Sequence, residues 1–158
     1  DNDALFDALE TGVVKRYITD FGTEDLLNKP NVTVFPHVGG STGEAELNCA
    51  IMAGQTIRRF METGEIVNSV NFPRVQQALS APYRITLINK NVPNIVARIS
   101  TAVSDFNINI DNIINRSKGD YAYTLLDLDE TDKSKIDELV AKFEASDNIV
   151  RVRLIKGK

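Results

Sequence analysis

The chain has 158 residues, of which 42% are hydrophobic and 25% are charged, and its formal net charge is -4 at pH 7. This size and composition predict one or two modest cores. The acidic balance argues against nucleic acid or an anionic membrane as a partner, because lysine and arginine drive such binding. The single cysteine, Cys49, excludes an intramolecular disulfide and fits a cytoplasmic protein, and the sequence has no visible signal peptide or membrane span.

The first part of the chain has the pattern of an α/β domain. Residues 1–12 predict a surface helix that is already under way at Asp1 and ends at Gly12. The apolar runs at 13–20 and 32–36 predict two buried strands of a parallel sheet, because neither run alternates cleanly. A helix already under way at the first residue suggests that the chain is a piece of a longer protein.

A long helix is expected next. Ser41 and Glu44 have the spacing of a capping box, and apolar residues then recur every three or four positions until Gly64, so the helix should run from about Thr42 to Thr63. Residues 68–73 predict a short return strand that ends at a proline.

The pattern changes after residues 74–81, which have no sustained period and are predicted to link two domains, 1–73 and 82–158. The second domain predicts the order strand, helix, strand, strand, helix, strand, which is the ferredoxin-like arrangement of an α+β fold. A bulge is expected at Asp111–Asn112, and a hairpin turn with Gly119 at a positive φ. The six expected segments are 83–88, 95–106, 108–115, 121–128, 136–143 and 149–155.

The only histidine, His37, follows the second apolar run and precedes a Gly-Gly turn and the capped helix. Open α/β sheets place their ligand crevice at such a strand end. Glu24 follows the preceding strand, so a carboxylate–imidazole pair suited to general acid/base chemistry is sterically reasonable. The alternatives are a hydrogen-bonded structural histidine and a solvated acidic loop.

Other kinds of site have little support in the sequence. No G-x-G-x-x-G motif follows a strand, so the chain is not expected to hold a dinucleotide by itself. Cys49 is expected to pack inertly on the long helix, and no residues have metal-ligand spacing. Asparagines around the first turn of the second domain are turn residues by default, although a cluster at a helix N-terminus could bind an amino-acid carboxylate. Asn91 and Asn109 are the strongest of these candidates.

The string FPHVGGSTGEAELNCAIMAGQTIRRF (35–60), followed by NSVNFP (68–73) and a ferredoxin-like domain, closely resembles the carboxyl-terminal part of the D-3-phosphoglycerate dehydrogenase family. The resemblance covers essentially the whole chain. It implies an α/β segment from the end of the catalytic domains of a Rossmann-like, NAD-dependent dehydrogenase, then an ACT regulatory domain. In that family the enzyme oxidises 3-phosphoglycerate to 3-phosphohydroxypyruvate on the route to L-serine.

The resemblance also implies roles for individual residues. His37 would be the acid/base residue, Glu24 its carboxylate partner, and Gly39 and Gly40 part of the cofactor site. The family's substrate-binding arginine and its glycine-rich NAD loop would both lie upstream of Asp1. The chain alone is therefore expected to be inactive and not to bind NAD.

ACT domains commonly pair with a second copy and bind an amino acid between the two. By position, the serine-binding residues of the family correspond to Asn89, Asn91 and Asn109, with asparagine in place of histidine at Asn89. Asn94 stands where the family usually has glycine, a position that asparagine can fill in a left-handed conformation. L-serine regulation and a homo-oligomer formed through this domain are thus expected. Two alternatives stay open: the tail of another D-2-hydroxyacid dehydrogenase, or a free-standing amino-acid-sensing module.

Overall fold

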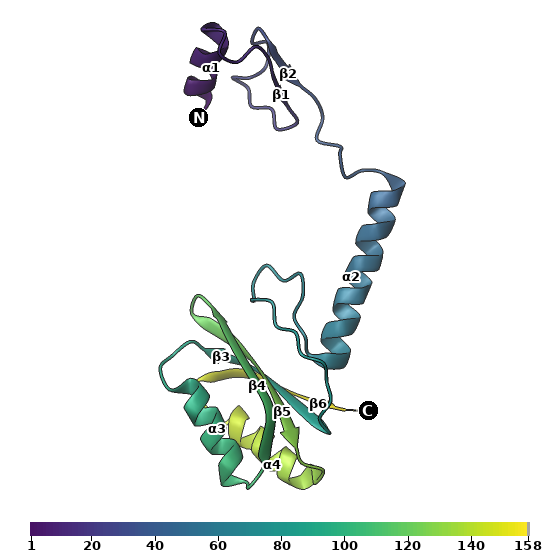
Figure 1. The fold of residues 1–158 in the computed structure, drawn as a ribbon, viewed down its shortest axis with the longest axis vertical. Helices are drawn as coiled ribbons and strands as arrows, with labels where there is room; N and C mark the ends of the chain where they lie inside the picture. The colour runs from purple at the N-terminus through teal and green to yellow at the C-terminus, as the bar shows by residue number, and fades with distance from the viewer. Residues whose placement is uncertain (158) are drawn as a thin grey trace. The chain divides into compact units, whose positions relative to one another are not determined.

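The computed structural model describes residues 1–157 and contains two compact units, Asp1–Ile51 and a second that begins at Met52 (Figure 1). Each unit is considered by itself below. None of the described helices is both long and apolar enough to cross a membrane.

The first unit contains a helix and two parallel strands. Helix α1 (Asn2–Glu10) is capped by the Asp1 carboxylate and is followed by Gly12 at φ +76°, which confirms the expected helix and its stop. Strands β1 (Tyr17–Thr19) and β2 (Val32–Val34) pair in parallel, as predicted. The predicted burial of these strands is wrong for this unit, since none of their residues is buried. A two-stranded sheet and one short helix offer too little surface to cover both faces.

Helix α2 (Gly43–Thr63) confirms the expected long helix, and it is followed by Gly64 at φ +72°. Its amino end differs in detail from the prediction. The Thr42 hydroxyl accepts a hydrogen bond from the Ala45 amide at 3.1 Å, whereas the Ser41 amide donates to the Val38 carbonyl. Thr42 is therefore the capping residue, one position later than the Ser41 that the capping-box spacing indicated.

The predicted return strand at 68–73 is also wrong. The chain makes a single antiparallel bridge between Ile66 and Val75, and the residues between them form the turn. Asn68 has φ +55°, and the Phe72 amide donates to the Ser69 hydroxyl. Local side-chain bonds of this kind compete with a strand ladder.

The second unit contains strands β3 (Tyr83–Lys90), β4 (Asn109–Lys118), β5 (Tyr121–Asp129) and β6 (Ile149–Lys156), and helices α3 (Ile95–Asp105) and α4 (Lys133–Glu144). The strands form an antiparallel sheet in the order β4-β5-β3-β6, with the two helices on one face (Figure 1). This arrangement confirms the ferredoxin-like prediction. The expected bulge is confirmed by a register shift between Ile110 and Asn112, and Gly119 has φ +63° in the hairpin.

The other face of this sheet is covered as well. Ile66 and Val75 pack there against Tyr123 and Leu125, and all four side chains are buried. Residues 74–81, predicted as a linker, therefore lie within the second unit, and the boundary between the two compact units falls instead at Ile51–Met52. Packing against the sheet is what holds this polar segment in place.

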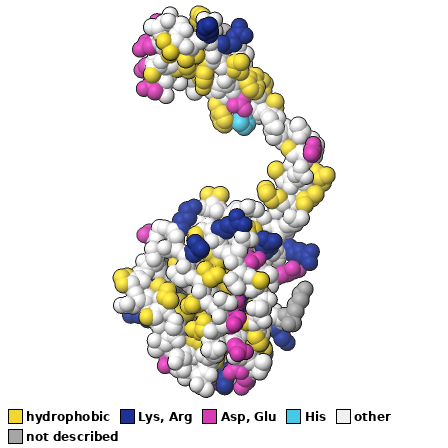
Figure 2. Space-filling view, in the orientation of Figure 1, with side chains coloured by type: hydrophobic (Ala, Val, Ile, Leu, Met, Phe, Trp, Pro, Cys, Tyr) yellow, Lys and Arg dark blue, Asp and Glu magenta, His cyan; other side chains and the backbone are white. Residues whose placement is uncertain are grey.

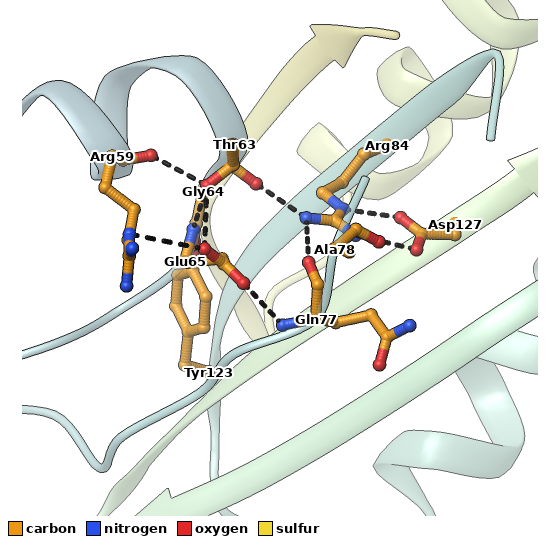
Figure 3. A network of polar contacts seen from close by, with 9 residues as sticks. All are labelled: Arg59, Thr63, Gly64, Glu65, Gln77, Ala78, Arg84, Tyr123 and Asp127. Atoms are coloured by element: carbon orange, nitrogen blue, oxygen red, sulfur yellow. Dashed lines mark hydrogen bonds and ion pairs between the residues drawn. The ribbon is translucent and has the colours of Figure 1, made fainter. Parts of the chain in front are cut away.

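Arg84 on β3 is the centre of the contact between the sheet and this covering segment (Figure 3). Its guanidinium forms two bonds to the Asp127 carboxylate, from Nε at 2.5 Å and Nη2 at 2.7 Å, and both side chains are fully buried. The remaining donors reach backbone carbonyls of Thr63, Gln77 and Ala78, at 2.9, 2.9 and 3.1 Å. All five N–H donors of the arginine are thus used.

Because Arg84 is buried, loss of its carboxylate would leave an uncompensated charge inside the protein. We expect Asp127→Ala to lower the free energy of unfolding by about 3–5 kcal/mol. The matched control is Asp137→Ala, which removes a carboxylate from the exposed Lys133–Asp137 pair on α4 and should have a much smaller effect, because surface ion pairs contribute little. Urea unfolding of both variants, followed by circular dichroism, makes the comparison. Equal losses would contradict the role given to Arg84.

Candidate functional site

His37 lies just beyond the carboxyl end of β2, in the first unit. Its Nδ1 atom is 2.9 Å from the Oδ2 atom of Asp20, which follows β1 directly. Because β1 and β2 are parallel, their carboxyl ends meet at one edge, and this brings the two side chains together. The Phe21 ring lies against the imidazole, with 4.5 Å between ring centroids. The Asp20 carboxylate contacts Nδ1, and the Phe21 ring contacts the imidazole ring. The Nε2 atom has no partner among residues 1–157.

The carboxylate beside His37 is therefore Asp20, not the Glu24 expected from the sequence. Glu24 lies in an exposed turn where its carbonyl accepts from the Leu27 amide, and its carboxylate forms no ion pair within the described part of the chain. The sequence did contain a signal for Asp20, because this residue follows β1 directly and is closer to that strand than Glu24 is. The resemblance favoured Glu24, and the strand geometry favours Asp20.

Gly39 and Gly40 form the exposed turn between His37 and α2. A Cβ atom built on either glycine would meet no atom within 4 Å, so this backbone is open to close approach by another group. The two glycines account for only part of a dinucleotide site, because the turn between β2 and α2 lacks the G-x-G-x-x-G spacing of a dinucleotide-binding loop. The residues of this chain do not fit NAD by themselves.

The three asparagines predicted to bind an effector have different surroundings in the second unit. Asn89 is fully buried, where its Oδ1 accepts from the Thr124 hydroxyl at 2.8 Å and its Nδ2 donates to the Lys90 carbonyl at 3.0 Å. Asn91 is exposed after β3 and donates to the Gly119 carbonyl at 3.0 Å, and Asn109 is exposed at the start of β4. Asn89 is therefore an internal residue, whereas the other two can be reached from solvent.

Asn91 and Asn109 do not meet within one copy of the chain. Asn91 contacts the β4–β5 hairpin at Gly119, whereas Asn109 begins β4 at the opposite end of that strand, opposite Asp129. The strand between them spans roughly 25–30 Å at about 3.3 Å per residue. Asn94, which lies between Asn91 and Asn109 in the sequence, has φ +64°. This value confirms the left-handed conformation expected for Asn94.

Cys49 is exposed on α2, so the inert packing expected for it is wrong. The helix has no buried residue in this structure, and nothing covers the cysteine in the described region. No group of three histidine, cysteine, aspartate or glutamate residues within 1–157 could hold a metal ion.

The resemblance to D-3-phosphoglycerate dehydrogenases is confirmed by comparison with known proteins. The chain is 31% identical over 139 residues to D-3-phosphoglycerate dehydrogenase 2 of Saccharomyces cerevisiae, and 26% identical over 133 residues to D-3-phosphoglycerate dehydrogenase of Escherichia coli. Each match covers 84% of this chain but only 29% and 32% of the relative. The chain thus spans about a third of the length of the curated relatives it matches. No family model matches it.

Two solved structures are similar to parts of the chain. The ACT domain from GTP pyrophosphokinase of Chlorobium tepidum has a TM-score of 0.42 and 18% identity, over 46% of this chain and 95% of the other. The regulatory subunit of aspartate kinase from Thermus thermophilus has a TM-score of 0.37 and 23% identity, over 49% of this chain and 52% of the other.

The contact between Asp20 and His37 predicts the tautomer of the neutral imidazole. A carboxylate beside Nδ1 favours the proton on that nitrogen, and nitrogen NMR of the only histidine measures where the proton lies. We expect Asp20→Ala to increase the Nε2–H tautomer and the matched change Glu24→Ala to leave the spectrum unchanged. If Glu24→Ala changes the tautomer and Asp20→Ala does not, Glu24 is the carboxylate that contacts His37 in solution.

Proposed function

We propose that the chain is the carboxyl-terminal part of a cytoplasmic, NAD-dependent D-3-phosphoglycerate dehydrogenase, an oxidoreductase that converts 3-phosphoglycerate to 3-phosphohydroxypyruvate in L-serine biosynthesis. The similarity to enzymes of that name over 84% of the chain is the observation that carries the proposal. The position of His37 at the carboxyl edge of two parallel strands adds a chemical reason, because ligands of open α/β sheets bind at this edge.

His37 is the group of this chain proposed to move a proton. Oxidation of the substrate 2-hydroxyl to a carbonyl removes a proton and a hydride. NAD bound in the longer enzyme would supply the hydride acceptor, and the free Nε2 of His37 would take the proton. The negative charge of Asp20 beside Nδ1 stabilises the imidazolium that results. Glu24 is kept as a second carboxylate for this role in the longer protein, where its turn would have further neighbours. The rest of the cofactor site and the substrate-binding arginine come from outside this chain.

The second unit is proposed to be an ACT domain that binds L-serine between two copies. Strand β4 is an edge strand of the sheet, so its N–H and C=O groups can pair with another β4. If two β4 strands pair antiparallel around a two-fold axis, Asn109 of one copy approaches the hairpin of the other. Asn91 contacts that same hairpin at Gly119. A dimer of this kind joins the two exposed asparagines that a single chain keeps apart.

Asn89 has a different role in this proposal. Its amide is buried and already paired with Thr124 and Lys90, so it supports the turn that carries Asn91 and does not contact the effector. The D-3-phosphoglycerate dehydrogenase family pattern has a histidine where this chain has Asn89. Serine recognition by this chain is therefore proposed to differ from the family pattern at this position.

The activity proposal is tested with the longer enzyme that contains this segment. We expect the 158-residue chain alone to form no NADH from 3-phosphoglycerate, and His37→Gln in the full-length enzyme to lower kcat by about 10²–10⁴, the usual contribution of general acid/base catalysis. Cys49→Ser, a change of similar size on an exposed residue, should leave kcat unchanged. NADH formed by the isolated chain would contradict the proposal.

The regulatory proposal is tested on the chain itself by calorimetry and sedimentation. L-serine should release or absorb heat on binding and increase the dimer fraction, and D-serine should do neither. Asn91→Ala and Asn109→Ala should each abolish the heat, while Asn71→Ala, at an exposed asparagine in the loop after α2, should not. If L-serine produces neither heat nor a change in sedimentation, serine is not the effector.

A further inference from the structure

A hollow of about 720 Å³ lies within the second unit, between the carboxyl-terminal half of α2 and the loop that follows. Its volume is in the range of small-molecule sites in proteins. Its wall contains three arginines, Arg58, Arg59 and Arg74. Figure 2 shows lysine and arginine side chains gathered around this part of the unit. Such a concentration is notable in a chain whose net charge is -4.

Two of these guanidinium groups have donors to spare. Arg74 bonds through Nε to the neutral amide of Gln76 at 2.6 Å and has no carboxylate partner among residues 1–157. Arg59 approaches the Glu65 carboxylate only to 3.7 Å, beyond hydrogen-bond distance. The terminal nitrogens of both side chains are therefore free to bind an anion.

The acidic residues in the wall do not cancel this charge. Glu65 is turned into the protein, where its Oε1 accepts from the Gln77 amide at 2.7 Å and its side chain is 13% exposed. Glu62 pairs with Arg58 at 2.9 Å, but both side chains are more than half exposed, and such surface pairs are weak and easily exchanged. The lining retains a net charge of about +1, and Arg74 is the arginine in it that has no carboxylate partner among residues 1–157.

The wall is also held in place. The bridge between Ile66 and Val75 closes the loop, with bonds of 2.8 and 3.0 Å. The Asn68 amide donates to the Thr56 hydroxyl on α2 at 3.1 Å, which ties the loop tip to the helix. Asn68 and Thr56 both line the hollow and add neutral polar atoms to it. A fixed set of donors loses little entropy when it binds a ligand.

We propose that this hollow binds a small phosphorylated metabolite, with the phosphate held by Arg59 and Arg74. The planar guanidinium fork matches phosphate oxygens in a bidentate manner, which favours phosphate over other anions. Arg74 also lines a neighbouring hollow of about 300 Å³ with Arg116, so the remainder of the ligand can extend over a second cation. The site is separate from the serine site proposed above and does not depend on it.

The test is an NMR titration of the full chain with inorganic phosphate, at an ionic strength kept constant with chloride. We expect saturable shifts at the backbone and side-chain amides of Asn68 and Gln55. Arg74→Ala should weaken binding about tenfold or more, because it removes a charge-assisted bond. Arg98→Ala removes an equal charge from the exposed surface of α3 and should leave the affinity unchanged.

Shifts that grow without saturation, or equal losses in the two variants, would overturn the site in favour of general screening of charge. Succinate is the second probe: binding as tight as that of phosphate would overturn the phosphate class, and weaker binding would support it. Urea unfolding of each variant checks that it is folded. If Arg74→Ala is unfolded, Arg59→Gln makes the same comparison with Arg98→Ala.

Discussion

The second unit depends on the buried pair of Arg84 and Asp127. A fully buried guanidinium is stable only when its charge is compensated and every donor is satisfied, and here the carboxylate and three carbonyls do both. Two of those carbonyls belong to residues 77–78 and the third to Thr63, at the end of α2. The pair therefore fixes the sheet, the end of the helix and the segment between them in one arrangement (Figure 3).

Other side chains of the sheet satisfy the same end of α2. The Tyr123 hydroxyl donates to the Gly64 carbonyl at 2.6 Å, and the Arg153 guanidinium donates to the carbonyls of Phe60 and Met61. The last carbonyls of a helix have no partners within the helix, so each needs one from outside. Because the sheet supplies them, the second half of α2 belongs to the ferredoxin-like unit. Burial also raises the pKa of the Tyr123 hydroxyl, which keeps it a neutral donor.

The sequence was informative where structure is set by neighbours along the chain. The three- and four-residue spacing predicted α2, the phase break at Asp111–Asn112 predicted the bulge, and glycine predicted the hairpin turn at Gly119. It was uninformative where the partner is distant. Arg84 and Asp127 are 43 positions apart, and each taken alone resembles a polar residue on an exposed strand face. Asp20 was missed for a different reason. The parallel pairing of β1 and β2 was predicted, but the spacing along the chain does not tell which acidic residue after β1 lies beside His37.

Strand β3 carried a partial signal of the missing contact. The run from Tyr83 to Leu87 is buried at every position, so both faces of this strand are covered. An antiparallel sheet with helices on one face ordinarily leaves polar residues on the other. In β3 that second face carries two polar residues, Arg84 and Thr86, and one apolar residue, Ile88. This combination is typical neither of a solvent-exposed face nor of an apolar core. Ile88 breaks the polar alternation that Arg84 and Thr86 begin on this face, so it indicates a covering segment, and that segment must also supply Arg84 with acceptors. Two of the three carbonyls that accept from Arg84, those of Gln77 and Ala78, belong to the residues that were predicted to be a linker because they have no sustained period.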